Sequence, residues 1–163
     1  MIRIYFAGPL FTSYERKFID ECALKLRNEG FEVFVPHEQG QNRTPEEAAR
    51  FASLSLREKA IEIFDIDYEG VCWANVMIAL LDGTQVDDGT ASEIGMFTEQ
   101  ILAGQDKLAI FGLADDQRVR PGTADGEGKG LNFYTVGCIY KAGGHVYGTI
   151  EEIIAELKKL QSN

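Results

Sequence analysis

The sequence has little of what would place the chain in a membrane or in an oxidising compartment. No apolar run approaches the roughly 20 residues that a membrane-spanning helix needs. The start, Met1 to Phe6, leads directly into strand-like sequence and lacks the apolar segment and cleavage site of a signal peptide. The cysteines Cys22, Cys72 and Cys138 are odd in number and unclustered, so neither a disulfide framework nor a zinc site is indicated. We therefore expect a cytoplasmic protein.

Positive charge is also scarce. Lysine and arginine number 16 against 26 acidic residues, which gives a net charge of −10. Nucleic-acid polymers are disfavoured as partners, because phosphate neutralisation dominates their binding. The acidity weighs more mildly against heavily phosphorylated substrates, since a local pocket can differ in sign from the whole surface. A neutral small molecule fits better.

Several motifs of known chemistry are missing. The turn Ala7-Gly8-Pro9-Leu10 lacks the glycine spacing of a dinucleotide site, and no phosphate-binding loop or G-x-S-x-G elbow occurs. The two histidines, His37 and His145, supply no metal-ligand spacing and make a Ser-His-Asp triad improbable. A receiver domain would need paired acids after the first strand, and none are there. Carboxylates and tyrosines remain, and we expect no metal and no organic cofactor.

What is present indicates one compact α/β domain over residues 1–163, of which 45% are hydrophobic. Strand-like runs at 2–6, 31–35, 74–81, 107–111 and 144–147 alternate with helical patterns that begin near residues 12, 44, 90, 135 and 149. The second helical pattern reaches about residue 68 and has room for a break. Such alternation predicts a parallel sheet wound by right-handed crossovers, here a flavodoxin-like three-layer fold of strand order 2-1-3-4-5.

Two stretches read as loops. Residues 37–43 are polar and follow Pro36, which is expected to stop the second strand. Residues 112–130 are rich in glycine and aspartate without an apolar period. A run of that length is usually either functional, here as a lid or an oligomer contact, or disordered.

The stretch from Asp87 to Gly95 follows the buried strand and opens a helix, where open α/β sheets bind their ligands. Glu93 is therefore expected in the first turn of that helix, as a nucleophile with Asp87 as its partner. The same letters also fit a capping box of Thr90 and Glu93, in which the glutamate only satisfies backbone N–H groups. The pattern alone leaves both readings open.

Several segments together resemble the nucleoside 2-deoxyribosyltransferase family. They are Ile4-Tyr5-Phe6-Ala7-Gly8-Pro9, Asp67, Asp87-Asp88-Gly89-Thr90-Ala91-Ser92-Glu93-Ile94-Gly95 and Leu131-Asn132-Phe133. They span nearly the whole chain in the family's order, and the D-x-G-T-A-x-E-x-G pattern is the most specific of them. The resemblance implies a flavodoxin-like enzyme of nucleotide salvage that moves 2-deoxyribose between purine or pyrimidine bases through a covalent enzyme–sugar intermediate.

The resemblance also implies roles for single residues. Glu93 would attack C1′, Tyr5 would orient it by hydrogen bonding, and Asp67 would bind the sugar or base end. Asp87 would carry a proton to the base, although Asp88 beside it is a competing choice. Asn132 would reach the site of a neighbouring subunit in a homo-oligomer, a dimer or a trimer of dimers. Substrate contacts are further expected from Gly8, Phe11, Asp88 and Tyr134, the last standing where members often carry methionine.

The chemistry suits these residue types. Breaking a glycosidic C–N bond develops oxocarbenium character at C1′, which a nearby carboxylate stabilises and can capture. The helix start is expected to keep Glu93 ionised without a cation. Tyr5 as a core residue, Asp67 as a turn residue and Asn132 as a loop cap are the structural alternatives. At the level of function, the alternatives are a nucleoside or nucleotide N-glycoside hydrolase and a non-catalytic nucleoside-binding module.

Overall fold

A five-stranded parallel sheet of order β2-β1-β3-β4-β5 forms the centre of the computed structural model, which describes residues 1–41, 44–116, 119 and 130–162. The strands are β1 (Arg3–Ala7), β2 (Glu32–Phe34), β3 (Val76–Leu80), β4 (Ala109–Leu113) and β5 (Val146–Tyr147). This confirms the predicted strand order. The chain adds strands to one side of β1 and then to the other, and this switch point between β1 and β3 creates the crevice at which such sheets bind ligands.

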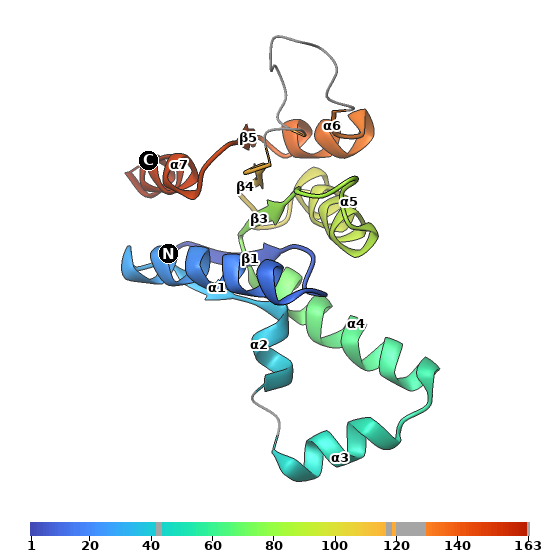
Figure 1. Cartoon of the computed structure of the whole chain (residues 1–163). Coiled ribbons are helices and arrows are strands. Elements are labelled where there is room, and N and C mark those ends of the chain that lie inside the picture. The colour runs from blue at the N-terminus through green and yellow to red at the C-terminus, as the bar shows by residue number, and fades with distance from the viewer. Residues whose placement is uncertain (42–43, 117–118, 120–129, 163) are drawn as a thin grey trace.

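Helices cover both faces of the sheet (Figure 1). On one face, α1 (Ser13–Asn28) and α7 (Ile150–Ser162) bury residues such as Ile19, Leu26 and Ile153 against Ile4 and Phe6 of β1. On the other face lie α4 (Leu56–Trp73), α5 (Asp88–Leu102) and α6 (Phe133–Lys141). Side chains alternate across a strand, so Tyr5 points to this second face while its neighbours Ile4 and Phe6 point to the first.

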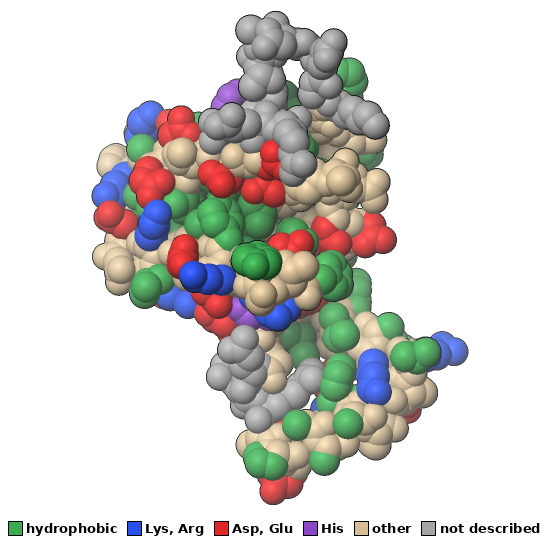
Figure 2. Space-filling view, in the orientation of Figure 1, with side chains coloured by type: hydrophobic (Ala, Val, Ile, Leu, Met, Phe, Trp, Pro, Cys, Tyr) green, Lys and Arg blue, Asp and Glu red, His purple; other side chains and the backbone are tan. Residues whose placement is uncertain are grey.

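Part of the helical layer projects away from the sheet as an arm (Figure 1). The arm consists of α3 (Pro45–Ser53) and the first half of α4, and α2 (Pro36–Gln41) leads toward it. None of the residues of α3 is buried. Arg50 of α3 pairs with Glu62 of α4 at 2.7 Å. Figure 2 shows hydrophobic side chains along the arm, and Leu56, Ile61 and Phe64 are among its exposed apolar residues. We call this element the α3–α4 arm.

Capping explains where most helices begin. Reciprocal capping boxes start four of them, with Thr12 and Glu15 at α1, Thr44 and Glu47 at α3, Ser55 and Glu58 at α4, and Thr149 and Glu152 at α7. The box at Ser55 also accounts for the break between α3 and α4, and α4 then continues to Trp73, beyond the expected end near residue 68.

One expectation was wrong: the stretch after Pro36 is not a loop, because residues 36–41 form α2. Proline suits the first position of a helix, where its missing N–H is not needed. The helix is short and polar, so the sequence has no apolar period that would predict it. It is held by contacts with residues of α1, which are distant in sequence. The predicted loop over residues 112–130 lies largely outside the described residues, at positions 117–118 and 120–129. Its first two residues, 112 and 113, belong to β4.

Over the described ranges, the structure contains no helix that is both long and apolar enough to cross a membrane.

Candidate active site

Glu93 lies on α5 and points toward the sheet. Because α5 begins at Asp88, Glu93 is its sixth residue and sits in the second turn, not the first as expected. Its side chain is half-buried. The helix starts earlier than predicted because Asp87, not Thr90, is the N-cap: Asp87 Oδ2 accepts hydrogen bonds from the Thr90 backbone N–H at 3.0 Å and from the Thr90 hydroxyl at 3.3 Å.

The capping-box interpretation of Glu93 is therefore wrong. A capping glutamate would accept a hydrogen bond from the N-cap backbone N–H. Instead, Glu93 Oε1 accepts a hydrogen bond of 2.6 Å from the hydroxyl of Tyr5. Tyr5 belongs to β1, 88 positions away in sequence, and is fully buried. The fold thus brings a strand tyrosine and a helix glutamate together at the carboxyl end of the sheet.

Burial dominates the electrostatics of this pair. The pKa of Glu93 is raised to about 7. Loss of hydration is the largest cause, the Tyr5 hydrogen bond opposes it, and the charges of Asp67 and Asp87 add to it. The expectation that the helix start keeps Glu93 fully ionised is therefore corrected: the carboxyl lies beyond the first turn, where the helix dipole falls off. The pKa of Tyr5 is raised by burial and by the charges of Glu93 and Asp67, so its hydroxyl stays protonated and donates.

Asp67 completes a cluster of acids around this pair. It stands on α4, half-buried, and burial raises its pKa to about 6. It is inside the helix and not at its end, so the turn interpretation of Asp67 is wrong. The charges of Asp67, on α4, and Asp87, the N-cap residue of α5, both raise the pKa of Glu93. A carboxyl in such surroundings can hold a proton at neutral pH that an isolated carboxyl would lose.

A cavity of about 280 Å³ adjoins Asp67. Apolar side chains form much of its wall, including Leu10 after β1, Phe51 of the arm and Ile63 and Ile66 of α4. His37 and Gln39 of α2 complete it. A concave, mostly apolar pocket with a few polar groups is the usual form of a small-molecule site.

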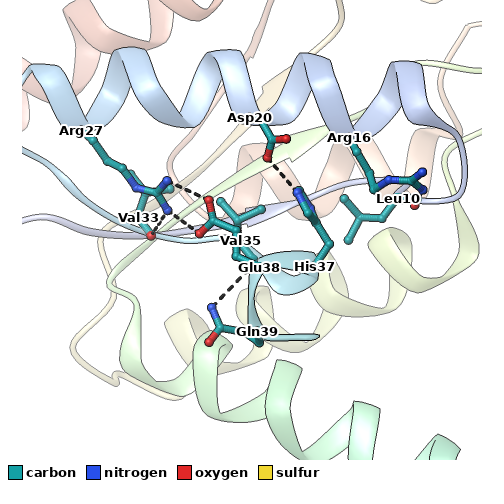
Figure 3. A network of polar contacts seen from close by, with 9 residues as sticks. All are labelled: Leu10, Arg16, Asp20, Arg27, Val33, Val35, His37, Glu38 and Gln39. Carbon is teal, nitrogen blue, oxygen red and sulfur yellow. Dashed lines mark hydrogen bonds and ion pairs between the residues drawn. The ribbon is translucent and has the colours of Figure 1, made fainter. Parts of the chain in front are cut away.

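The α2 side of this cavity is fixed to α1 by polar contacts (Figure 3). Arg27 donates two hydrogen bonds to the Glu38 carboxylate, at 2.8 and 2.7 Å. The His37 ring, whose side chain is 9% exposed, contacts Asp20 Oδ1 through Nε2 at 2.7 Å. Gln39 donates to the Val35 carbonyl oxygen. Sequence reasoning did not place His37 or Gln39 here, although their position directly after β2 was a usable signal, since it puts them at the carboxyl end of a parallel strand.

A second cavity, of about 450 Å³, contains Asp88 and Asn132 together with Thr84, Ala91 and Thr135. Asp88 is exposed at the first residue of α5, away from the Tyr5–Glu93 contact. Asn132 is the N-cap of α6, because its Oδ1 accepts from the backbone N–H groups of Tyr134 at 2.9 Å and Thr135 at 3.4 Å. The cap interpretation of Asn132 is therefore confirmed, and its side chain remains exposed.

The other expected substrate contacts lie at the surface or in the packing. Tyr134 is 81% and Phe11 79% exposed, and neither lines the two cavities described above. Gly8 has a packing reason, since a Cβ there would meet Ile19 at 2.9 Å and Leu80 at 3.0 Å. Among the expected residues, the structure thus groups Tyr5, Asp67, Asp87 and Glu93.

Known proteins resemble most of this chain in sequence or in fold. The sequence model of the family described as nucleoside 2-deoxyribosyltransferase matches residues 4–147. No curated protein matches the sequence significantly. A conserved protein from Enterococcus faecalis is similar in structure, with a TM-score of 0.74 and 27% identity over 98% of both chains.

Two further solved structures share the fold. A 2-deoxyribosyltransferase from Bacillus psychrosaccharolyticus has a TM-score of 0.64 at 18% identity, covering 93% of this chain and 89% of its own. A CMP N-glycosidase from Clostridium botulinum has a TM-score of 0.54 at 20% identity, covering 97% and 98%. At these identities the likeness shows the fold alone.

Proposed function

Because the chain belongs to the nucleoside 2-deoxyribosyltransferase family, we propose that it exchanges nucleobases on 2-deoxyribose, with Glu93 as the nucleophile. The observation that carries the proposal is the 2.6 Å hydrogen bond from the buried Tyr5 hydroxyl to Glu93 Oε1. It holds one carboxylate oxygen in place and leaves the second, Oε2, as the atom that attacks C1′. A nucleophile oriented by a third group is the usual arrangement in covalent catalysis.

In this mechanism, the leaving base departs as C1′ gains oxocarbenium character, and Glu93 forms an ester with the sugar. The acceptor base then attacks the face that the first base vacated, so the configuration at C1′ is retained. A buried carboxyl beside other carboxyls reacts well here, because ester formation neutralises its charge and so relieves the desolvation, and the smaller repulsion, that raise its pKa.

Protons must travel with the bases. We assign their transfer to Asp87, the N-cap residue of α5, whose charge acts on Glu93. Asp67, with its pKa of about 6, is partly protonated near neutral pH and suits binding of the base or sugar end beside the apolar cavity. Asp88 is a weaker candidate for proton transfer than Asp87, because its side chain is exposed.

The site is proposed to be completed by a second copy of the chain. Asn132 is exposed, and its neighbours Phe133 and Tyr134 project from the start of α6 with 93% and 81% of their surface accessible. Exposed aromatic residues of this kind are enriched in protein interfaces. In a homo-oligomer, Asn132 and Tyr134 would face the sugar bound in the site of the neighbouring subunit.

The test is a panel of deoxynucleoside donors mixed with free acceptor bases, followed by chromatography. Transfer predicts a new nucleoside that carries the acceptor base. Free sugar without a new nucleoside would favour the alternative, an N-glycoside hydrolase, in which water intercepts the glycosyl enzyme. If neither product forms and nucleosides still bind, the protein is a binding module and the proposal fails.

A further inference from the structure

The phenol ring of Tyr5 stacks on the ring of Phe34. The two residues are direct partners in the parallel pairing of β1 with β2. Their ring centroids lie 5.5 Å apart, and the ring planes are 19° from parallel. Since β2 is the edge strand of the sheet, Phe34 is the strand side chain that borders Tyr5 on this side. Its position therefore limits how far the Tyr5 ring can tilt.

The ring of Phe34 is in turn in close contact with the backbone of α4 at Gly70. A Cβ at this position would lie 2.6 Å from Phe34 Cε1 and 2.8 Å from Cδ1. Carbon atoms in contact prefer about 3.5–4.0 Å, so any side chain at position 70 would displace the ring or the helix by roughly 1 Å. The rings of Tyr5 and Trp73 border Phe34 at centroid distances of 5.5 and 6.5 Å, while another side of Phe34 lines a cavity of about 560 Å³. Gly70 is thus the residue that lets α4 approach Phe34 this closely.

The same contact governs the placement of Asp67. Residues three apart lie on the same side of a helix, so Asp67 and Gly70 both face the sheet from α4. The charge of Asp67 is felt by both Tyr5 and Glu93. A helix held further from Phe34 would carry Asp67 away from both residues.

We propose that Gly70 and Phe34 are positioning residues: the close approach at Gly70 holds the Phe34 ring, and this ring holds the Tyr5 hydroxyl on Glu93. The inference rests on the proposed role of Glu93 as nucleophile. The hydroxyl lies at the far end of the Tyr5 ring, so a small tilt of the ring moves the 2.6 Å contact more than any other part of the residue. Misplacement of a reacting group by about 1 Å can lower a rate roughly 100-fold.

A double-mutant cycle separates this role from ordinary packing. Phe34→Leu is measured in the parent and in Tyr5→Phe, which keeps the ring and removes the hydroxyl. We expect kcat to fall about tenfold in the parent and to change less than twofold in Tyr5→Phe, because residues that act through one contact are not additive. Equal losses in both backgrounds would mean that Phe34 only supports the fold, and the inference would be overturned.

Glycine substitutions provide the matched comparison. Gly70→Ala should reproduce the loss seen with Phe34→Leu. Gly137→Ala, in α6, adds the same methyl group to a helix where nothing lies within 4 Å of the new Cβ, and should keep the parent kcat. If Gly70→Ala does not fold, Phe34→Leu still decides the question.

A measurement without turnover distinguishes this inference from the proposed function. The Glu93 carboxyl carbon is labelled with ¹³C and titrated by NMR. Tyr5→Phe should raise the pKa of Glu93, because the hydrogen bond that stabilises the carboxylate is lost. Phe34→Leu should raise the pKa in the same direction and add nothing in the Tyr5→Phe background. An unchanged or lowered pKa in Phe34→Leu overturns the inference, whereas absence of base exchange in the parent protein overturns only the proposed function.

Discussion

At the scale of the residue, Glu93 combines two properties that oppose each other. Its burial disfavours the charged form, while the Tyr5 hydroxyl favours it, and burial prevails with a pKa of about 7. A shift of this size corresponds to a cost on the order of 3 kcal/mol for holding the carboxylate ionised in the fold. Residues kept at such a cost are frequent at functional sites.

The rate should therefore depend on pH around neutrality. A nucleophile must be ionised, so kcat/KM is expected to rise with pH and to level off above about 7, as Glu93 loses its proton. Tyr5→Phe removes a hydrogen bond that lowers this pKa, so the midpoint should move to higher pH. Initial rates of base exchange across the pH range check both points. A midpoint that stays at the pKa of an ordinary glutamate, or one that moves down in Tyr5→Phe, would contradict this account.

At the scale of the element, the start of α5 combines a structural and a chemical demand in one residue. Asp87 caps the helix through Oδ2 and is also proposed to carry protons. Two substitutions separate the roles. Asp87→Asn keeps a capping oxygen and should leave the unfolding free energy within a few tenths of a kcal/mol, whereas Asp87→Ala should lower it by about 1 kcal/mol. Thermal or urea unfolding provides the measurement.

Enzyme activity should depend on the carboxyl group of Asp87 and not on its ability to cap α5. If Asp87 transfers the proton, both substitutions lower kcat to a similar extent, by about 100-fold or more. An asparagine variant with parent activity would assign Asp87 to capping alone and transfer the chemical role to another acid. Asp88→Asn is the matched control, since Asp88 is exposed at the next position.

Most helices and strands, but not all, could be predicted from the sequence. The strand order and most helices followed from periodicity, because apolar faces must be buried in either structure. The tendency of the chain to begin helices with capping boxes was likewise readable at Thr12 and Thr44. The similar pattern of Thr90 and Glu93 predicted a capping box that does not form, because the tertiary contact with Tyr5 decides where the Glu93 side chain points. For a similar reason α2 was missed: its contacts, such as Arg27 with Glu38, join separate parts of the chain.

The candidate site was likewise only partly predictable from the sequence. The position of Asp87 and Glu93 after a buried strand predicts their place at the edge of the sheet, whereas Tyr5 and Asp67 were expected beside them only from the family resemblance. The structure groups these four residues. The stacking of Phe34 on Tyr5 could not be read from the sequence, because it depends on strand register and on helix approach, which leave no local pattern. The position of His37 directly after β2 was a usable signal.

At the scale of the whole molecule, the exposed apolar surface is uneven. The α3–α4 arm and the start of α6 present large apolar side chains to solvent, among them Phe64 and Phe133. Groups of exposed apolar side chains often mark interaction sites. It is consistent with the proposed homo-oligomer, in which Asn132 of one copy serves the site of another.

Subunit mixing tests this arrangement. Glu93→Ala and Asn132→Ala should each be inactive or nearly so, but a mixed dimer contains one site with an intact Glu93 and an intact Asn132 from the partner subunit. Mixing the two variants after mild dissociation should therefore restore activity, measured as base exchange. Mixing Glu93→Ala with Tyr5→Phe is the control and should restore nothing, because both residues belong to the same site of one chain. No recovery in the first mixture would show that Asn132 does not act across an interface.

The central claim is that the Glu93 carboxylate forms an ester with the sugar. The most direct measurement is mass spectrometry of the protein after brief incubation with a deoxynucleoside and acid quenching. We predict a mass increase of one deoxyribosyl group on the peptide that contains Glu93, and its disappearance when an acceptor base is added. A label on another peptide, or undiminished base exchange by Glu93→Ala, would contradict the claim.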